Sequence, residues 1–164
     1  MSKISIIICT YNEVNFIKKT LYQIKKKIKN SEIIIVDDNS YDGTLEVLKK
    51  LRNKIKFTLI VRKNVRGLAT ALSKGFKRAK GQYIGTFDVN MPDQINYFNK
   101  AIKELDSGND IVVLSRYVKG GSDKRILLRT STSFLINKLS KFILKIPFND
   151  FTNEIFIMKK KIIK

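Results

Sequence analysis

A run of apolar, β-branched residues leads directly into a cluster of acidic residues, and this feature constrains the fold of the chain most. The run is Ile33–Val36, and the segment after it contains Asp37, Asp38 and Asp42. A continuous apolar run of this length is typical of a buried strand in a parallel sheet. In open α/β sheets, ligands bind outside the carboxyl ends of the strands. We therefore expect the three carboxylates to lie at such an edge and to meet a ligand there.

Strand-like and helical patterns alternate over the first two-thirds of the chain. Strands are predicted at residues 4–9, 33–36, 57–61, 83–87 and 111–114, with amphipathic helices between them. This alternation predicts a mostly parallel sheet with right-handed crossovers. A long basic helix and a final strand at residues 150–158 are predicted for the remainder. Polar clusters follow four of the strands, at residues 10–13, 37–44, 88–90 and 115–116, and parallel strands should bring all four to one crevice.

The residue types exclude several kinds of site. The chain has one cysteine and no histidine, which excludes an intrachain disulfide, a cysteine-based zinc site and a histidine acid–base group. A metal would have to be a hard cation held by oxygen ligands, Mg²⁺ or Mn²⁺. There is no run of about 20 apolar residues, so no transmembrane helix is predicted. The first residues read as a strand rather than a signal peptide, and we expect a cytoplasmic protein.

The formal charge of +19, from 33 basic and 14 acidic residues, has two interpretations. It indicates an anionic partner, which can be a nucleotide, a phospholipid surface or a nucleic acid. It also fits a compositional bias, because lysine predominates over arginine. Base recognition in nucleic acids relies on bidentate arginine, so a basic nucleic-acid-binding module is only a minor alternative, and no nucleic acid is expected as partner.

Carboxylates at a sheet edge in a basic protein suit a nucleoside diphosphate. One carboxylate can accept a hydrogen bond from a ribose hydroxyl or a base N–H, and others can hold a divalent cation that neutralises the phosphates. Arg116 can donate two hydrogen bonds to a phosphate. Neither a P-loop motif nor a dinucleotide Gly-x-Gly-x-x-Gly motif after the first strand is present, so those two nucleotide-binding classes are not expected.

Five motifs occur in an order that resembles a known family. They are Thr10–Glu13, Asp37–Thr44, Arg66–Leu68, Gly75–Gly81 and Ser115–Gly121. Together they look like the family 2 glycosyltransferases, and the dolichol-phosphate mannosyltransferase-like subgroup in particular. The resemblance implies an α/β GT-A fold, which is Rossmann-like with a mostly parallel central sheet flanked by helices. It also implies a single glycosyltransferase domain over residues 1–164 that is short and lacks the family's C-terminal extension.

The resemblance implies a role for individual residues. The nucleotide-sugar would contact Cys9, Tyr11, Glu13, Val36, Asp38, Asp88, Val89, Asn90 and Arg116. Asp88 and Asn90 would bind the metal, Mg²⁺ or Mn²⁺, and Asp88 and Arg116 would be catalytic. Two further patterns also look like the subgroup, namely Arg129, Ser133 and Asn137 on one helical face, and Asp150-x-Thr152.

The implied reaction is an inverting, metal-assisted hexosyl transfer. A mannose- or glucose-type sugar would pass from a GDP- or UDP-sugar to a polyprenyl phosphate, either dolichyl or undecaprenyl, with the protein peripheral on the cytoplasmic face of a membrane. A phosphate oxygen is ionised at pH 7, so such an acceptor needs no general base, in agreement with the lack of histidine.

One departure from the family pattern leaves a second function open. The Asp-x-Asp motif of the family reads here as Asp88-Val89-Asn90, and a neutral amide replaces a charged metal ligand. The alternative is a catalytically impaired GT-A relative that binds a nucleotide-sugar or a partner protein without transferring sugar.

Overall fold

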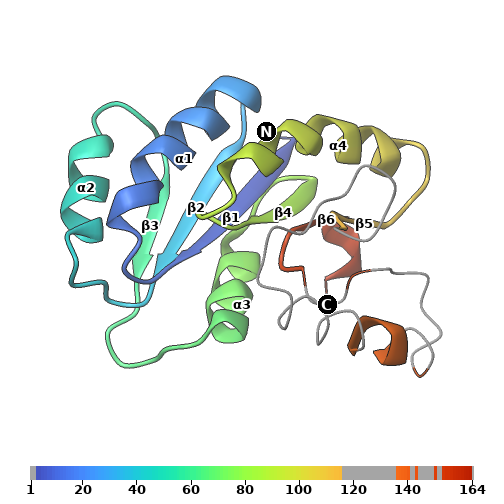
Figure 1. Ribbon diagram of the computed structural model, residues 1–164. Helices are drawn as coiled ribbons and strands as arrows, with labels where there is room; N and C mark the ends of the chain where they lie inside the picture. The colour runs from blue at the N-terminus through green and yellow to red at the C-terminus, as the bar shows by residue number, and fades with distance from the viewer. Residues whose placement is uncertain (1–2, 116–135, 141–142, 144–149, 151–152, 164) are drawn as a thin grey trace.

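The computed structural model describes residues 3–115, 136–140, 143, 150 and 153–163. Its centre is a six-stranded sheet in the order β3-β2-β1-β4-β6-β5 (Figure 1). Strands β1 to β4 are all parallel, whereas β6 runs antiparallel to both of its neighbours. The strands are β1 Ile4–Thr10, β2 Glu32–Asp37, β3 Thr58–Val61, β4 Tyr83–Phe87, β5 Ile111–Val113 and β6 Phe156–Lys159.

Helices cover both faces of the sheet, as Figure 1 shows. One face carries α1, α2 and α4, and its core contains Ile6, Ile8 and Ile35 from the central strands. The other face carries α3, which packs on Ile7 and Ile34. The helices are α1 Val14–Lys27, α2 Thr44–Leu51, α3 Leu68–Arg78 and α4 Phe98–Asp106, with short 3₁₀ helices η1 Pro92–Tyr97 and η2 Lys160–Ile162. The predicted doubly covered, mostly parallel sheet is confirmed.

The strand sequences explain the central position of β1 and β2. Five of the seven residues of β1 are isoleucine or cysteine, and Ile6, Ile7 and Ile8 are fully buried on alternating faces. Helix α3 approaches β1 so closely that a Cβ at Gly75 would lie 2.5 Å from the Ile7 side chain. A glycine there lets the helix pack directly on the strand.

The register of the sheet brings four strand ends to one edge. Thr10, the last residue of β1, pairs with Asp37, and Asp37 pairs with Val61 at the end of β3. Ile8 pairs with Phe87, the last residue of β4. The loops that follow these strands therefore lie side by side at this carboxyl edge.

The C-terminal part differs in detail from the prediction. The final strand was expected over residues 150–158, but it begins at Phe156 and ends at Lys159. Asn153 Oδ1 instead accepts a hydrogen bond from Ile155 N at 3.2 Å, which holds residues 153–155 in a turn. Residues 136–140 and 143 are helical, as expected, and the rest of the predicted basic helix lies outside the described residues.

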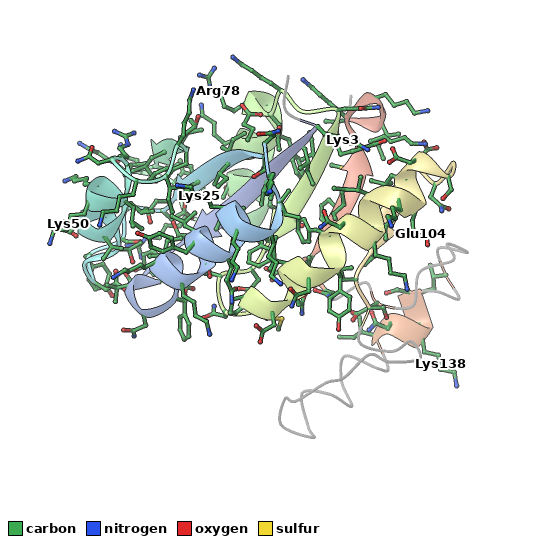
Figure 2. The ribbon with its side chains drawn as sticks, turned by 90° about the horizontal axis from the view of Figure 1, so that it is seen from above. Lys3, Lys25, Lys50, Arg78, Glu104 and Lys138 are labelled. Atoms are coloured by element: carbon green, nitrogen blue, oxygen red, sulfur yellow. The ribbon has the colours of Figure 1, made fainter. Side chains whose placement is uncertain are left out.

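Part of the large positive charge has a local structural role. The last turns of α1, α2 and α3 hold Lys25–Lys27, Lys49–Lys50 and Lys77–Arg78. Cations at a helix C-terminus interact favourably with the helix dipole, by about 0.3–1 kcal/mol each at exposed positions. Figure 2 shows the labelled Lys25, Lys50 and Arg78 at different places on the molecule. Within the described ranges, no helix has the length and apolarity needed to cross a membrane.

Candidate functional site

Backbone-to-side-chain hydrogen bonds fasten the β1–α1 loop to the β2–α2 loop at the carboxyl edge. Asn12 N donates to Ser40 Oγ at 2.9 Å, and Tyr41 N donates to Asn12 Oδ1 at 3.1 Å. Glu13 N donates to Thr44 Oγ1 at 2.8 Å. Asn12 adopts a left-handed conformation (φ 60°), which asparagine tolerates better than most residues. The two loops therefore form one rigid support for the side chains that they carry.

Two of the three acidic residues that follow the second strand have structural hydrogen bonds. Asp37 is fully buried and accepts from Thr10 Oγ1 at 2.7 Å and from Ser40 N and Oγ at 2.8 and 2.7 Å. Asp42 accepts from the backbone N–H of Val14, the first residue of α1, at 3.0 Å, and from Thr44 Oγ1 at 2.6 Å. Burial raises the pKa of the Asp42 carboxyl, but these hydrogen bonds outweigh it and the pKa is lowered. Both carboxylates hold the loops in place.

Asp38 is paired with an arginine from the neighbouring strand end. Arg62 Nε donates to Asp38 Oδ1 at 2.6 Å, and Arg62 Nη2 donates to Oδ2 at 2.7 Å. The Asp38 side chain is only 11% exposed and the Arg62 side chain only 9%. Gly67 N also donates to Asp38 Oδ2, at 3.0 Å, and Arg62 Nη1 donates to Thr70 Oγ1 at 2.8 Å. This forked pair connects the end of β2 to the end of β3 and to the start of α3.

Arg62 is a residue of the candidate site that the sequence motifs did not indicate. It directly follows Val61, the last residue of β3, and so reaches the same edge as the other loops. Its position in the sequence could have indicated this. A basic residue directly after a predicted parallel strand lies at the same sheet edge as the acidic residues that follow the adjacent strands. Its partner Asp38 lies 24 residues away in sequence, and no local pattern connects the two.

A second acidic group forms where the β1–α1 loop meets the β4–η1 loop. Asn90 Nδ2 donates to Glu13 Oε1 at 3.2 Å, and Asn90 N donates to Asp88 Oδ1 at 2.9 Å. Burial raises the pKa of the Glu13 carboxyl, and the negative charges of Asp88 and Asp42 raise it further, whereas the hydrogen bond from Asn90 lowers it. Negative charge is therefore concentrated here with no cation beside it among the described residues.

The donor set of this acidic group fits a divalent cation that the substrate helps to hold. Asp88 and Asn90 provide a carboxylate and an amide oxygen, and Glu13 adds nearby negative charge. In the described part of the chain, no group of three or more His, Cys, Asp or Glu side chains is arranged to hold a metal alone. Mg²⁺ sites commonly use one or two carboxylates and take their other ligands from substrate phosphates and water.

The raised pKa of Glu13 predicts a pH-dependent effect on stability. Because the pKa is higher in the folded protein than in the unfolded chain, the contribution of Glu13 is fully present below the unfolded value and is lost as pH rises through the folded value. We expect Glu13→Gln, which cannot ionise, to gain stability relative to wild type as pH increases from 4 to 7. Thermal unfolding of both proteins from pH 4 to 7 tests this prediction. A stability difference between them that does not change with pH would contradict a raised pKa of Glu13.

The other predicted site residues differ in how deeply their side chains are buried. Val36 and Val89 are buried, so their side chains belong to the core, and Val89 O already accepts a hydrogen bond from Thr20 Oγ1 at 3.1 Å. Burial raises the pKa of the Cys9 thiol to about 12, with a further increase from Asp38, so this thiol is neutral at pH 7. Tyr11 is 38% exposed at the edge. Arg116, predicted to contact phosphate, lies outside the described residues.

The subgroup pattern near the C-terminus is described only in part. Asn137 Nδ2 donates to Asp150 Oδ1 at 3.3 Å, and both side chains are buried. The two patterns noted in the sequence therefore meet at these residues. Arg129, Ser133 and Thr152 lie outside the described residues.

Comparison with solved structures gives the class of fold. The mannosyltransferase PcManGT from Pyrobaculum calidifontis, solved in complex with GDP-Man and Mn²⁺, superposes with a TM-score of 0.59 at 25% identity over 69% of this chain and 35% of that one. Glucosyl-3-phosphoglycerate synthase from Mycobacterium tuberculosis gives a TM-score of 0.70 at 14% identity over 98% of this chain and 56% of that one. The fold is the GT-A glycosyltransferase fold.

Sequence comparison identifies the family. The chain is 36% identical over 121 residues to a dolichol-phosphate mannosyltransferase of Pyrococcus furiosus, which is 73% of this chain and 34% of that protein. It is 29% identical over 116 residues to a cholesterol galactosyltransferase of Borreliella burgdorferi, 70% of this chain and 32% of that protein. The chain thus spans about a third of the length of these relatives. The family model for glycosyl transferase family 2 matches residues 5–164, and the chain belongs to this family.

Proposed function

We propose that the carboxyl edge of the sheet binds a nucleoside diphospho-sugar and that the chain transfers its sugar, with inversion, to a polyprenyl phosphate. The observation that carries the proposal is the meeting of Tyr11, Glu13, Asp38 and Asp88 at one edge in a family 2 glycosyltransferase. The dolichol-phosphate mannosyltransferase relative supports the lipid acceptor, and the complex of PcManGT with GDP-Man and Mn²⁺ supports the donor.

The proposed roles follow from the surroundings of each side chain. Tyr11 and Asp38 lie toward the nucleoside end, where Tyr11 is partly exposed and the forked pair with Arg62 holds the Asp38 carboxylate in a fixed position. Glu13, Asp88 and Asn90 lie toward the diphosphate end. A divalent cation, Mg²⁺ or Mn²⁺, held there by Asp88 and Asn90 would neutralise the leaving diphosphate. Arg116 is proposed to contact phosphate near the reacting centre.

The acceptor chemistry agrees with the groups that the chain provides. The chain contains no histidine. A lipid phosphate is already ionised at pH 7, so the attack of its oxygen on the anomeric carbon needs positioning and charge stabilisation but no proton transfer. We propose that the protein meets this acceptor at the cytoplasmic surface of a membrane.

Donor binding is tested by thermal unfolding with nucleotide and metal. A ligand present at 100 times its Kd stabilises the folded state by about 2.7 kcal/mol. For a protein of this size, that corresponds to a rise in Tm of roughly 5–10 °C. We expect this rise with UDP or GDP together with Mn²⁺, and a much smaller one with Mn²⁺ alone, because Asp88 and Asn90 offer too few ligands by themselves. If UDP, GDP and their sugars all leave Tm unchanged, donor binding is refuted.

A second candidate function is binding of the nucleotide-sugar without transfer. The observation in its favour is Asn90, whose neutral amide occupies the second Asp position of the family motif and donates to Glu13. A transfer assay with dolichyl or undecaprenyl phosphate and labelled GDP- and UDP-sugars separates the two functions, since both candidates bind donor but only the first forms a glycosylated lipid.

A further inference from the structure

The outer side of helices α1 and α2 carries a dense set of exposed lysines. The two helices pack against each other on the same face of the sheet, and Lys25 Nζ donates to Lys54 O at 2.8 Å between them (Figure 1). Helix α1 contains no acidic residue, and α2 contains only Glu46. We use the name basic face for six exposed lysines of these helices, Lys18, Lys19, Lys25, Lys26, Lys49 and Lys50.

Neither ion pairs nor the helix dipoles account for the basic face. Among the described residues, none of its lysines forms an ion pair, whereas Lys3 beside α4 pairs with Asp106 at 2.8 Å. Lys18 and Lys19 lie in the first half of α1, beyond the last turn in which a cation interacts favourably with the dipole. Like charges held on one surface repel each other, and an anionic partner relieves this repulsion.

Aromatic side chains lie among these lysines. Tyr22 is 39% exposed and lies one helical turn from both Lys18 and Lys26, and Phe16 in the first turn of α1 is 43% exposed. Lysines interspersed with exposed aromatic rings are typical of surfaces that lie against a membrane, where the rings reach the headgroup level. Base recognition in nucleic acids relies on arginine instead, and the basic face contains none.

The two helices also run to the edge of the sheet that carries the candidate site. Helix α1 begins at Val14, directly after Glu13, and α2 begins at Thr44, two residues after Asp42. A surface that lies along both helices therefore extends to the carboxyl edge. Helix α3 lies on the opposite face of the sheet, so its exposed Lys74 and Lys77 point away from such a surface.

We propose that the basic face docks on an anionic phospholipid leaflet, with its lysines near the headgroup phosphates and Tyr22 and Phe16 at the headgroup level. Lysine suits this contact because it is a flexible point charge and the phosphates of a leaflet have no fixed arrangement. The attraction falls off within a Debye length, so only lysines on the docked side contribute strongly. This inference names the surface by which the protein meets a lipid acceptor, and in that respect it rests on the proposed function.

Vesicle binding of two matched double variants tests the proposal. Lys19→Gln with Lys26→Gln removes two charges from the basic face, and Lys74→Gln with Lys77→Gln removes two from exposed positions of α3. Wild type and both variants are sedimented with vesicles of phosphatidylcholine alone or mixed with phosphatidylglycerol. We expect wild type to bind only the mixed vesicles, and more weakly as salt is raised. The α1 variant should bind them roughly thirtyfold more weakly, and the α3 variant nearly as well as wild type.

Four results would overturn the docking proposal. Wild type can fail to bind the mixed vesicles, or it can bind both kinds of vesicle equally. Both variants can bind as wild type does, in which case another part of the chain meets the lipid. Both can be weakened equally, in which case only the total charge matters. Finally, RNA can compete with the vesicles for the same lysines and bind more tightly, in which case the face takes a nucleic acid.

The docking proposal and the proposed function can fail separately. Nucleotide binding is measured without vesicles, by the rise in Tm with UDP or GDP and Mn²⁺, and the α1 variant should show the same rise as wild type because Lys19 and Lys26 lie outside the candidate site. If wild type binds nucleotide but not the mixed vesicles, the docking proposal alone is overturned. If it binds the vesicles through the basic face but binds no nucleotide, the proposed function fails and the docking surface stands.

Discussion

Replacement of Arg62 by methionine is expected to destabilise the protein by about 3–5 kcal/mol, the cost of breaking a buried ion pair by removing one partner. Asp38 is only 11% exposed on its side chain, and the variant leaves its carboxylate with Gly67 N as the single donor among the described residues. Methionine keeps most of the length and apolar volume of the arginine, so the lost charge dominates. For 164 residues the fall in Tm is on the order of 10 °C. Thermal and urea unfolding measure it.

The loop provides a matched control for this prediction. Arg66→Met makes the same chemical change four residues further on, at an exposed side chain without hydrogen bonds to the described residues, and should alter stability by less than about 0.5 kcal/mol. The double variant Arg62→Met with Asp38→Asn should recover part of the loss, because the uncompensated charge is gone. Equal small effects of Arg62→Met and Arg66→Met would show that the buried pair does not hold the loop.

The sheet and the meeting of the polar loops at its carboxyl edge could be predicted because both depend on local patterns. The apolar run at Ile33–Val36 and the alternation of strands and helices are readable from neighbouring residues. Parallel pairing then places the loops at one edge, as the register of Thr10 with Asp37 shows. The roles within the edge could not be predicted in the same way. The residue pattern without the family resemblance does not separate Asp37, Asp38 and Asp42, whereas their hydrogen-bond partners in the folded protein do.

Those partners lie at long sequence separations. Asp38 meets Arg62, 24 residues later, and Glu13 meets Asn90, 77 residues later. Neither contact has a local signal, because side chains at parallel strand ends pair according to strand order, and strand order cannot be read from one strand. The final strand was predicted to begin at residue 150, whereas β6 begins at Phe156, for a related reason. The residues before Phe156 look extended in sequence, but Asn153 bonds to Ile155 N and forms a turn.

Restoring the family motif by Asn90→Asp should increase Mn²⁺ affinity in the presence of nucleoside diphosphate by about tenfold or more, which corresponds to about 1.4 kcal/mol. The variant adds a full negative charge beside Asp88, and an opposite charge at this range stabilises a divalent ion by several kcal/mol before desolvation is subtracted. It also removes the hydrogen bond from Asn90 Nδ2 to Glu13 and brings a third carboxylate to the group. The variant should therefore be less stable than wild type without metal and gain more in Tm when Mn²⁺ and nucleotide are added.

Asn96→Asp is the matched control, because it makes the same substitution at an exposed position of η1 and should leave Mn²⁺ affinity unchanged. Mn²⁺ binding is followed by electron paramagnetic resonance, and sugar transfer to polyprenyl phosphate is followed with labelled donor. If Asn90→Asp binds Mn²⁺ no better than wild type, Asp88 and Asn90 do not form the metal site. If it binds more tightly and transfer appears only in the variant, the wild-type asparagine limits catalysis. If it binds more tightly and neither protein transfers sugar to any lipid phosphate, the missing charge at position 90 does not explain the lack of transfer. The function is then binding of the nucleotide-sugar without transfer.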